Sequence, residues 1–142
     1  MWCIDKDKCV IEDDMQKIYQ SLKNTDVLVI GTPIYMGQMT GQAKIFIDRL
    51  YPQISPRFSP YYNPDNAGKK LILIFTQGNP DIFKFQTYID YTKMIFEMLE
   101  FNVIDVLVIG GTRQTPACKQ EELINKKIEN LYKKDIFVLN NK

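Results

Sequence analysis

Long apolar runs alternate with polar segments along the chain and predict three buried strands. The runs cover residues 27–31, 71–75 and 103–109. Their nearly continuous apolar character is typical of parallel strands that are covered on both faces. A polar segment containing glycine follows each run, so each predicted strand is expected to end in a turn or loop.

Helical periodicity fills the segments between these runs. Apolar residues recur every three or four positions over about 14–23, 40–50, 83–100 and 121–134. Asp13 or Asp14 is expected to cap the first of these helices, and Thr40 the second. The residues predicted to face the core are Met15, Ile18, Tyr19, Leu22, Ala43, Phe46, Ile47, Leu50, Phe85, Ile89, Met94, Ile95, Met98, Leu99, Leu123, Ile124, Ile128 and Leu131.

Strands that are separated by helices indicate right-handed crossovers, and hence an α/β fold with a three-layer, doubly wound parallel sheet. Neither repeats nor a linker mark a second domain, so residues 1–142 are predicted to form one domain. Prolines at every fourth position exclude a helix over 51–69. This segment is either a surface excursion or subunit contact, or a lid over a ligand site. Residues 135–139 are predicted to form a short extended piece.

Composition narrows the possible functions. A formal net charge of +1 provides no field for nucleic acid or an anionic membrane surface. No apolar run approaches the roughly 20 residues of a membrane span. The chain has no histidine, which excludes Ser-His-Asp and Cys-His catalysis and histidine-containing metal sites. Three cysteines do not make an even disulfide framework, which favours a reducing cytoplasm.

The segment 32–42 carries the candidate chemistry, because it connects a buried strand to a helix. In open α/β sheets, ligands bind at the carboxyl ends of the strands. Pro33 fixes the backbone there, and Gly37 and Gly41 permit close approach of the backbone to a ligand. Flat or polarizable apolar side chains add to this surface: Tyr35, Met36 and Met39. The combination suits a planar heterocycle with a polar edge, and an ordinary connection with core-facing residues is the alternative.

Residues 32–49 read Thr-Pro-Ile-Tyr-x-Gly-Gln-Met-Thr-Gly-Gln-x-Lys-x-Phe-Ile-Asp-Arg. This pattern resembles the flavin-ring loop and following helix of the NADPH-dependent FMN reductase and iron-sulfur flavoprotein branch of the flavodoxin-like superfamily. The resemblance implies an FMN-dependent oxidoreductase, with NAD(P)H or a redox protein as the electron donor. A flavodoxin-type electron carrier and a non-catalytic fragment are the alternatives.

The resemblance also implies which residues contact the flavin ring: Pro33, Ile34, Tyr35, Met36 and Gly37, with Thr76, Gln77 and Gly78 from the second strand end. Backbone amides near Met36 and Gly37 would face the pyrimidine edge of the ring. Tyr35 would either stack on the ring or pack the loop onto the sheet. The alternative to a ring contact for the turn after the second strand is an ordinary turn that leads into the next helix. The glycines after the third strand are expected to lie farther from the ring. No residue is predicted to be a catalytic proton donor.

Aligned through this loop, the predicted strands resemble strands 3, 4 and 5 of the flavodoxin-like order 2-1-3-4-5. Strand 1, the phosphate loop, helix 1 and strand 2 would all precede Met1, so an N-terminally truncated member is expected. Without a phosphate loop at a helix N-terminus, FMN is expected to bind more weakly. The strand at 27–31 would also be an apolar edge, which favours association between copies of the chain.

Two cysteines near the start of the chain resemble part of an iron-sulfur motif. Cys3 and Cys9 match the third and fourth cysteines of the [4Fe–4S] run in the iron-sulfur branch. Because such a cluster needs four thiolates, it is expected only in a full-length parent, and no metal site is predicted here. Cys118 is expected to be an incidental core or loop thiol.

Overall fold

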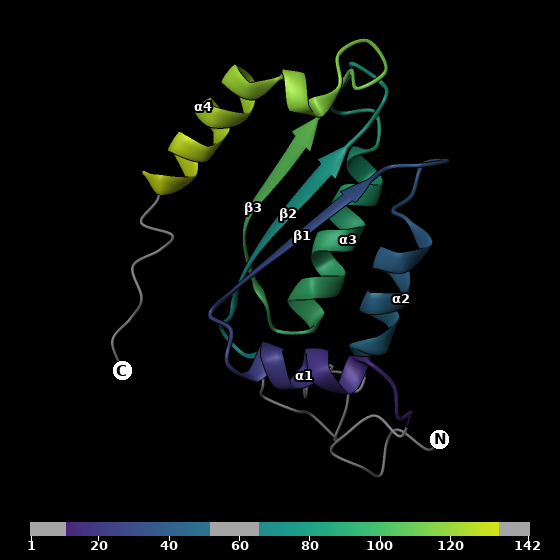
Figure 1. The fold of residues 1–142 in the computed structure, drawn as a ribbon, viewed down its shortest axis with the longest axis vertical. Coiled ribbons are helices and arrows are strands. Elements are labelled where there is room, and N and C mark those ends of the chain that lie inside the picture. Colours follow the sequence, from purple (N-terminus) through teal and green to yellow (C-terminus); the bar gives the residue numbers. More distant parts are fainter. Residues whose placement is uncertain (1–10, 52–65, 134–142) are drawn as a thin grey trace.

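The predicted alternation of helices and strands is present in the computed structural model, which describes residues 11–51 and 66–133 (Figure 1). Its elements are α1 (Met15–Lys23), β1 (Val27–Pro33), α2 (Gly41–Arg49), β2 (Lys70–Thr76), α3 (Gln86–Met98), β3 (Asn102–Ile109), a short 3-10 helix (Ala117–Lys119) and α4 (Glu121–Tyr132).

The strands form a parallel sheet in the order β1-β2-β3, which confirms the predicted α/β fold. β1 pairs with β2 in unbroken register from Val27–Lys70 to Pro33–Thr76. The β2–β3 register shifts by one residue after Leu71, because Leu71 pairs with Val103 whereas Ile72 pairs with Asp105. All three strands therefore finish side by side at one edge of the sheet (Figure 1).

The main core lies on the face of the sheet that packs against α1, α2 and α3. Alternate residues of β2 point into it, and Phe75 is 1% exposed. Phe96 of α3 is fully buried and meets Phe101 edge to face, with ring centroids 5.8 Å apart. The buried members of this core are Met15, Tyr19, Leu22, Ile34, Ile47, Leu50, Leu71, Leu73, Phe75, Ile89, Phe96, Leu99 and Phe101.

The opposite face of the sheet has a smaller core under α4, which makes α4 the third layer. Leu131 of α4 packs there with Leu107 of β3, beside Ile74 and Ile104. Over β1 this face is open among the described residues, where Val29 is 53% exposed. The prediction that the first strand is covered on both faces is therefore wrong for this part of the chain. The strand order agrees with the prediction that the first strand forms an apolar edge of the sheet.

The predicted cap at Thr40 is confirmed. At α1 the N-cap position is Asp14, whose side chain makes no capping bond, and the side chain of Asp13 caps the helix from one residue earlier. The carboxylate of Asp13 accepts a hydrogen bond from the Met15 N–H at 3.0 Å, and Thr40 Oγ1 accepts one from the Ala43 N–H at 3.3 Å. Each cap satisfies an amide that has no partner within its own helix.

Several predicted core positions are wrong. In α3, Met94 is 45% exposed, and the buried stripe is Ile89, Thr92 and Phe96. At about 100° per residue these three share one side of the helix, whereas Met94 lies well away from it. Three further positions predicted to face the core are exposed: Ile18, Leu123 and Ile128. Leu123 and Ile128 belong to α4, which lies beside β3 at the border of a narrow sheet (Figure 1). Only one stripe of the α4 surface meets the strands there, so these two side chains stay exposed.

One helix start also differs from prediction: α3 begins at Gln86 rather than near 83, after a series of turns. Most of the proline-containing segment 51–69, Cys3, Cys9 and the extended piece at 135–139 lie outside the described residues. Within residues 11–51 and 66–133, no helix combines the length and apolar character needed to cross a membrane. The same residues contain no group of three or more cysteine, aspartate or glutamate side chains that could hold a metal ion.

Candidate functional site

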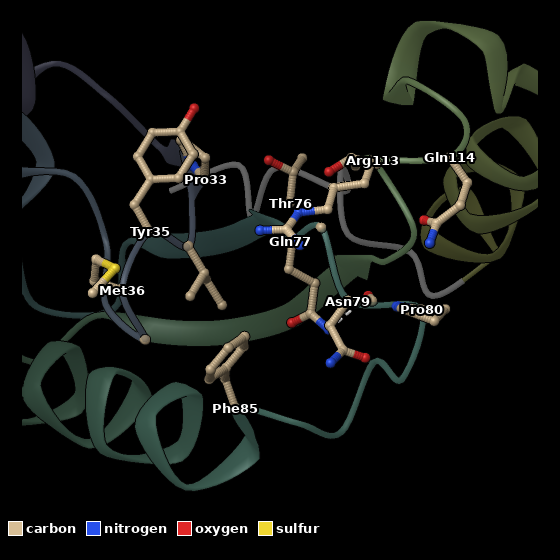
Figure 2. Close-up of a pocket in the computed structure, with 14 residues that line it drawn as sticks. Pro33, Tyr35, Met36, Thr76, Gln77, Asn79, Pro80, Phe85, Arg113 and Gln114 are labelled. Atoms are coloured by element: carbon tan, nitrogen blue, oxygen red, sulfur yellow. Dashed lines mark hydrogen bonds between the residues drawn. The ribbon is translucent and has the colours of Figure 1, made fainter.

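A pocket of about 650 Å³ lies at the carboxyl ends of the strands, a typical size for a small-molecule site. Figure 2 shows Tyr35 and Met36 on one side of it and Arg113 and Gln114 on the other. The structure brings all of the predicted ring-contact residues together along its wall: Pro33, Ile34, Tyr35, Met36, Gly37, Thr76, Gln77 and Gly78.

The first wall is a tight two-residue turn after β1. The Tyr35 N–H donates to the Gln38 carbonyl at 2.8 Å, and the Gln38 N–H donates back at 3.0 Å. Met36 and Gly37 between them have φ of 51° and 84°, the positive values of a type I′ turn. The amides of Met36 and Gly37 have no hydrogen-bond partner among the described residues, so they remain available to a ligand.

This turn is held at both ends. The Ile34 N–H donates to the Thr76 carbonyl at 2.8 Å, which joins the end of β1 to the end of β2. The Met39 N–H donates to the Tyr88 hydroxyl of α3 at 3.1 Å. The turn between these anchors is therefore fixed relative to both the sheet and α3.

The side chains of the turn point away from the core. Tyr35 is 67% exposed and Met36 is completely exposed, so Tyr35 does not pack the loop onto the sheet. Met39, by contrast, packs against the main core and does not line the pocket. Phe85 lies across from the turn, with its ring edge 3.8 Å from where a Cβ on Gly37 would be.

The second wall contains a buried polar side chain. Gln77 is 2% exposed, and its Nε2 donates to the carbonyls of Asn79 at 3.2 Å and Asp81 at 2.6 Å. Because carbonyls only accept, these bonds fix the orientation of the amide. Its Oε1 is shielded from solvent and has no hydrogen-bond partner in the part of the chain that the structure describes. A buried acceptor without a hydrogen bond destabilises the folded protein by about 1–3 kcal/mol. A hydrogen-bond donor on a ligand would offset this cost if it reached the oxygen.

The third wall follows β3, and the sequence interpretation missed it. The Gly111 N–H donates to the Asn79 carbonyl at 2.9 Å, and the Thr112 N–H donates to the Gln77 carbonyl at 3.1 Å. These bonds draw the loop after β3 against the turn after β2. Residues missed by the sequence interpretation therefore line the pocket: Asn79, Pro80, Phe85, Thr112, Arg113 and Gln114. The strand-end rule, applied to the third strand as fully as to the first, would have indicated the last three.

The pocket is mostly apolar and carries positive charge. Arg113 is the one charged residue among the described residues that line it. Backbone amides, the amide side chains of Gln77, Asn79 and Gln114, and aromatic surface make up much of the rest. Such a lining can bind and orient a planar ligand that has hydrogen-bonding groups on its edge.

The profile of the family described as "Flavodoxin-like fold" matches residues 5–134. The chain belongs to this family. The match confirms the resemblance seen in residues 32–49 and agrees with the parallel sheet and the position of the pocket.

Similar proteins include flavoproteins. The chain is 43% identical to an iron-sulfur flavoprotein of Methanosarcina thermophila over 47 residues, which are 33% of this chain and 25% of that protein. It is 29% identical over 73 residues, 51% of this chain and 40% of the other, to a Bacillus subtilis protein assigned as an NAD(P)H-dependent FMN-containing oxidoreductase. The match therefore spans less than half the length of either relative.

A solved structure supports the same fold. The Trp repressor binding protein from Bacillus subtilis superposes with a TM-score of 0.63 at 25% identity, over 79% of this chain and 67% of the other.

Proposed function

We propose that the pocket binds the isoalloxazine ring of FMN, and that the chain takes part in NAD(P)H-dependent flavin oxidoreduction. The observation that carries the proposal is convergence: two loops that are about 40 residues apart in sequence, both implicated by the resemblance, form one pocket. The description of the Bacillus subtilis relative as FMN-containing and NAD(P)H-dependent supports the choice of cofactor and donor.

The residues present suit a flavin ring. Its edge carries carbonyl oxygens and ring nitrogens that accept hydrogen bonds, and the unpaired amides of Met36 and Gly37 can donate them. It also carries an N–H donor, which suits the unpaired Oε1 of Gln77. Tyr35 and Phe85 provide aromatic surface beside these groups.

Bound FMN would supply the electron-transfer chemistry, and the chain would supply position and electrostatics. Amides that are fixed before the ligand arrives stabilise negative charge on a ring edge without reorganising. The amides of Met36 and Gly37 meet this condition, because the anchors on either side of their turn hold it in place.

An electron carrier is the second candidate. Tyr35 and Met36 project from the wall of the pocket with little or no cover among the described residues. A redox protein that docked over the pocket would bury these side chains. In that case the chain would pass electrons to a protein and would have no small-molecule substrate of its own.

A matched pair of glycine substitutions tests the flavin site. Gly37 and Gly68 have φ of 84° and 75°, so alanine at either position costs about 1–2 kcal/mol of backbone strain. Only Gly37 lines the pocket. Titration of FMN, followed by quenching of its fluorescence, is expected to show about tenfold weaker binding for Gly37→Ala, the equivalent of about 1.4 kcal/mol. Gly68→Ala should bind FMN as the wild type does.

NAD(P)H oxidation in the presence of FMN separates the two candidates. Turnover with a small-molecule acceptor supports the oxidoreductase, and flavin binding without such turnover supports the carrier. A folded protein that neither quenches FMN fluorescence nor gains thermal stability from FMN would contradict both, and would favour a non-catalytic fragment.

A further inference from the structure

The guanidinium of Arg113 is a charged group in the pocket that the proposed flavin contacts do not use. No ion pair or hydrogen bond joins its side chain to any other described residue. No carboxylate lies among the described residues that line the pocket, so its charge is not neutralised there.

The backbone that carries Arg113 is fixed. Gly111, with φ of 69°, begins a turn in which its carbonyl accepts from the N–H groups of Gln114 and Thr115, both at 3.0 Å. The Gly111 N–H in turn donates to the Asn79 carbonyl at 2.9 Å. Arg113 therefore projects from a closed turn that is bonded to the loop after β2.

The side chain of Arg113 lies along the wall of the pocket. A Cβ on Gly78 would lie 2.9 Å from Arg113 Cγ and 3.2 Å from its Nε, so the glycine leaves the space that the arginine occupies. Figure 2 shows the side chain of Arg113 extending from the loop after β3 toward Thr76 and Gln77. The result is a guanidinium that is positioned at the pocket and has no partner among the described residues.

We propose that Arg113 binds an oxyanion, a carboxylate or phosphate, on the small molecule that exchanges electrons at this pocket. This inference rests on the proposed function. The planar guanidinium offers paired N–H donors that match a carboxylate or phosphate. Arg113 follows β3, two strands from β1. The phosphate of FMN is expected on the far side of β1, at the switch point of the strand order in this fold. The anion is therefore assigned to the redox partner rather than to the flavin phosphate.

Two inert planar probes test this assignment: 2-naphthoate and its neutral isostere 2-naphthamide. Their dissociation constants are measured by calorimetry at low ionic strength, where screening is weak, on both the FMN-loaded and the flavin-free protein. The wild type is expected to bind naphthoate about tenfold more tightly than naphthamide, the equivalent of a charge-assisted hydrogen bond. R113Q should abolish this preference, and R113K should keep part of it.

Lys119→Gln is the matched control. It removes the same charge from a residue six positions along the chain that does not line the pocket. It should leave the naphthoate preference unchanged.

An equal preference in wild type and R113Q, or no binding of either probe by the wild type, would overturn the assignment. So would a loss of FMN affinity in R113Q without a change in probe preference, because Arg113 would then serve the flavin. If the wild type fails to bind FMN, the proposed function fails. The probe preference of the flavin-free protein still decides the role of Arg113.

Discussion

Gly110 lies where the loop after β3 closely approaches the loop after β2. A Cβ at this position would lie 2.8 Å from the Asn79 carbonyl oxygen and 3.0 Å from that of Pro80. Both atoms belong to backbone, which cannot move aside as a flexible side chain can. A glycine here lets the loop after β3 pack against the loop after β2.

Gly110→Ala is therefore expected to destabilise the protein by about 1–3 kcal/mol, the usual cost of overpacking. Gly31→Ala is the matched control, because a Cβ there has nothing within 4 Å. It should change stability by less than about 0.5 kcal/mol or raise it slightly. Urea denaturation gives both values, and equal midpoints for the two variants would contradict the prediction.

At the scale of elements, an ion pair joins the start of α1 to the end of α2. Asp13 accepts from the Met15 N–H and from the guanidinium of Arg49, whose Nη2 lies 3.0 Å from Asp13 Oδ1. Tyr19 of α1 also donates its hydroxyl to the carbonyl of Arg49. The hydrogen bond from Arg49 holds the pKa of Asp13 below its usual value.

This lowered pKa predicts a pH-dependent stability. The carboxylate contributes stability above about pH 4, the ordinary pKa of aspartate, and loses it as pH falls through the folded-state pKa. Asp13→Asn should lower the Tm at neutral pH, and the difference from wild type should shrink in acid. Thermal unfolding between neutral and acidic pH measures this change.

Asp14→Asn is the control for that experiment. Within residues 11–51 and 66–133, the side chain of Asp14 forms one ion pair, with the highly exposed Lys17 at 3.1 Å. Because exposed pairs contribute little, this variant should show a much smaller and flatter difference in Tm. If the Tm differences of the two variants from wild type depended on pH in the same way, the prediction for Asp13 would be contradicted.

At the scale of the whole molecule, β1 forms an edge of the sheet that none of the described residues protects. The strand contains no charged residue, and Val29 is 53% exposed on the open face of the sheet. Edge strands in stable proteins usually carry charges or a covering element, and neither is present over β1 among the described residues. We therefore expect copies of the chain to associate through β1.

Val29→Lys is expected to weaken this association, because it places a charge on the strand at the open face. Ile45→Lys is the control, since Ile45 is 63% exposed on α2 and does not belong to β1. Sedimentation velocity over a range of concentrations should show a smaller sedimentation coefficient for Val29→Lys alone. A wild type that stays monomeric at every concentration would contradict the prediction.

The sequence by itself determined features that depend on neighbouring residues. The apolar runs identified the three strands. The pair Asp13 and Asp14 marked the start of α1 and Thr40 that of α2, because a cap bonds an amide two or three residues away. The pattern over residues 32–49 also identified the family, since it is long and unbroken. The first wall of the pocket followed from the same local chemistry.

Only the tertiary structure decided which loops meet and which faces are covered. The third wall depends on hydrogen bonds between the loops after β2 and β3, and on a register that shifts by one residue between these strands. Burial of Phe96 and exposure of Leu123 depend on where each helix lies over a narrow sheet. A helical period marks the apolar side of a helix, but the width of the layer beneath it sets how much of that side is buried.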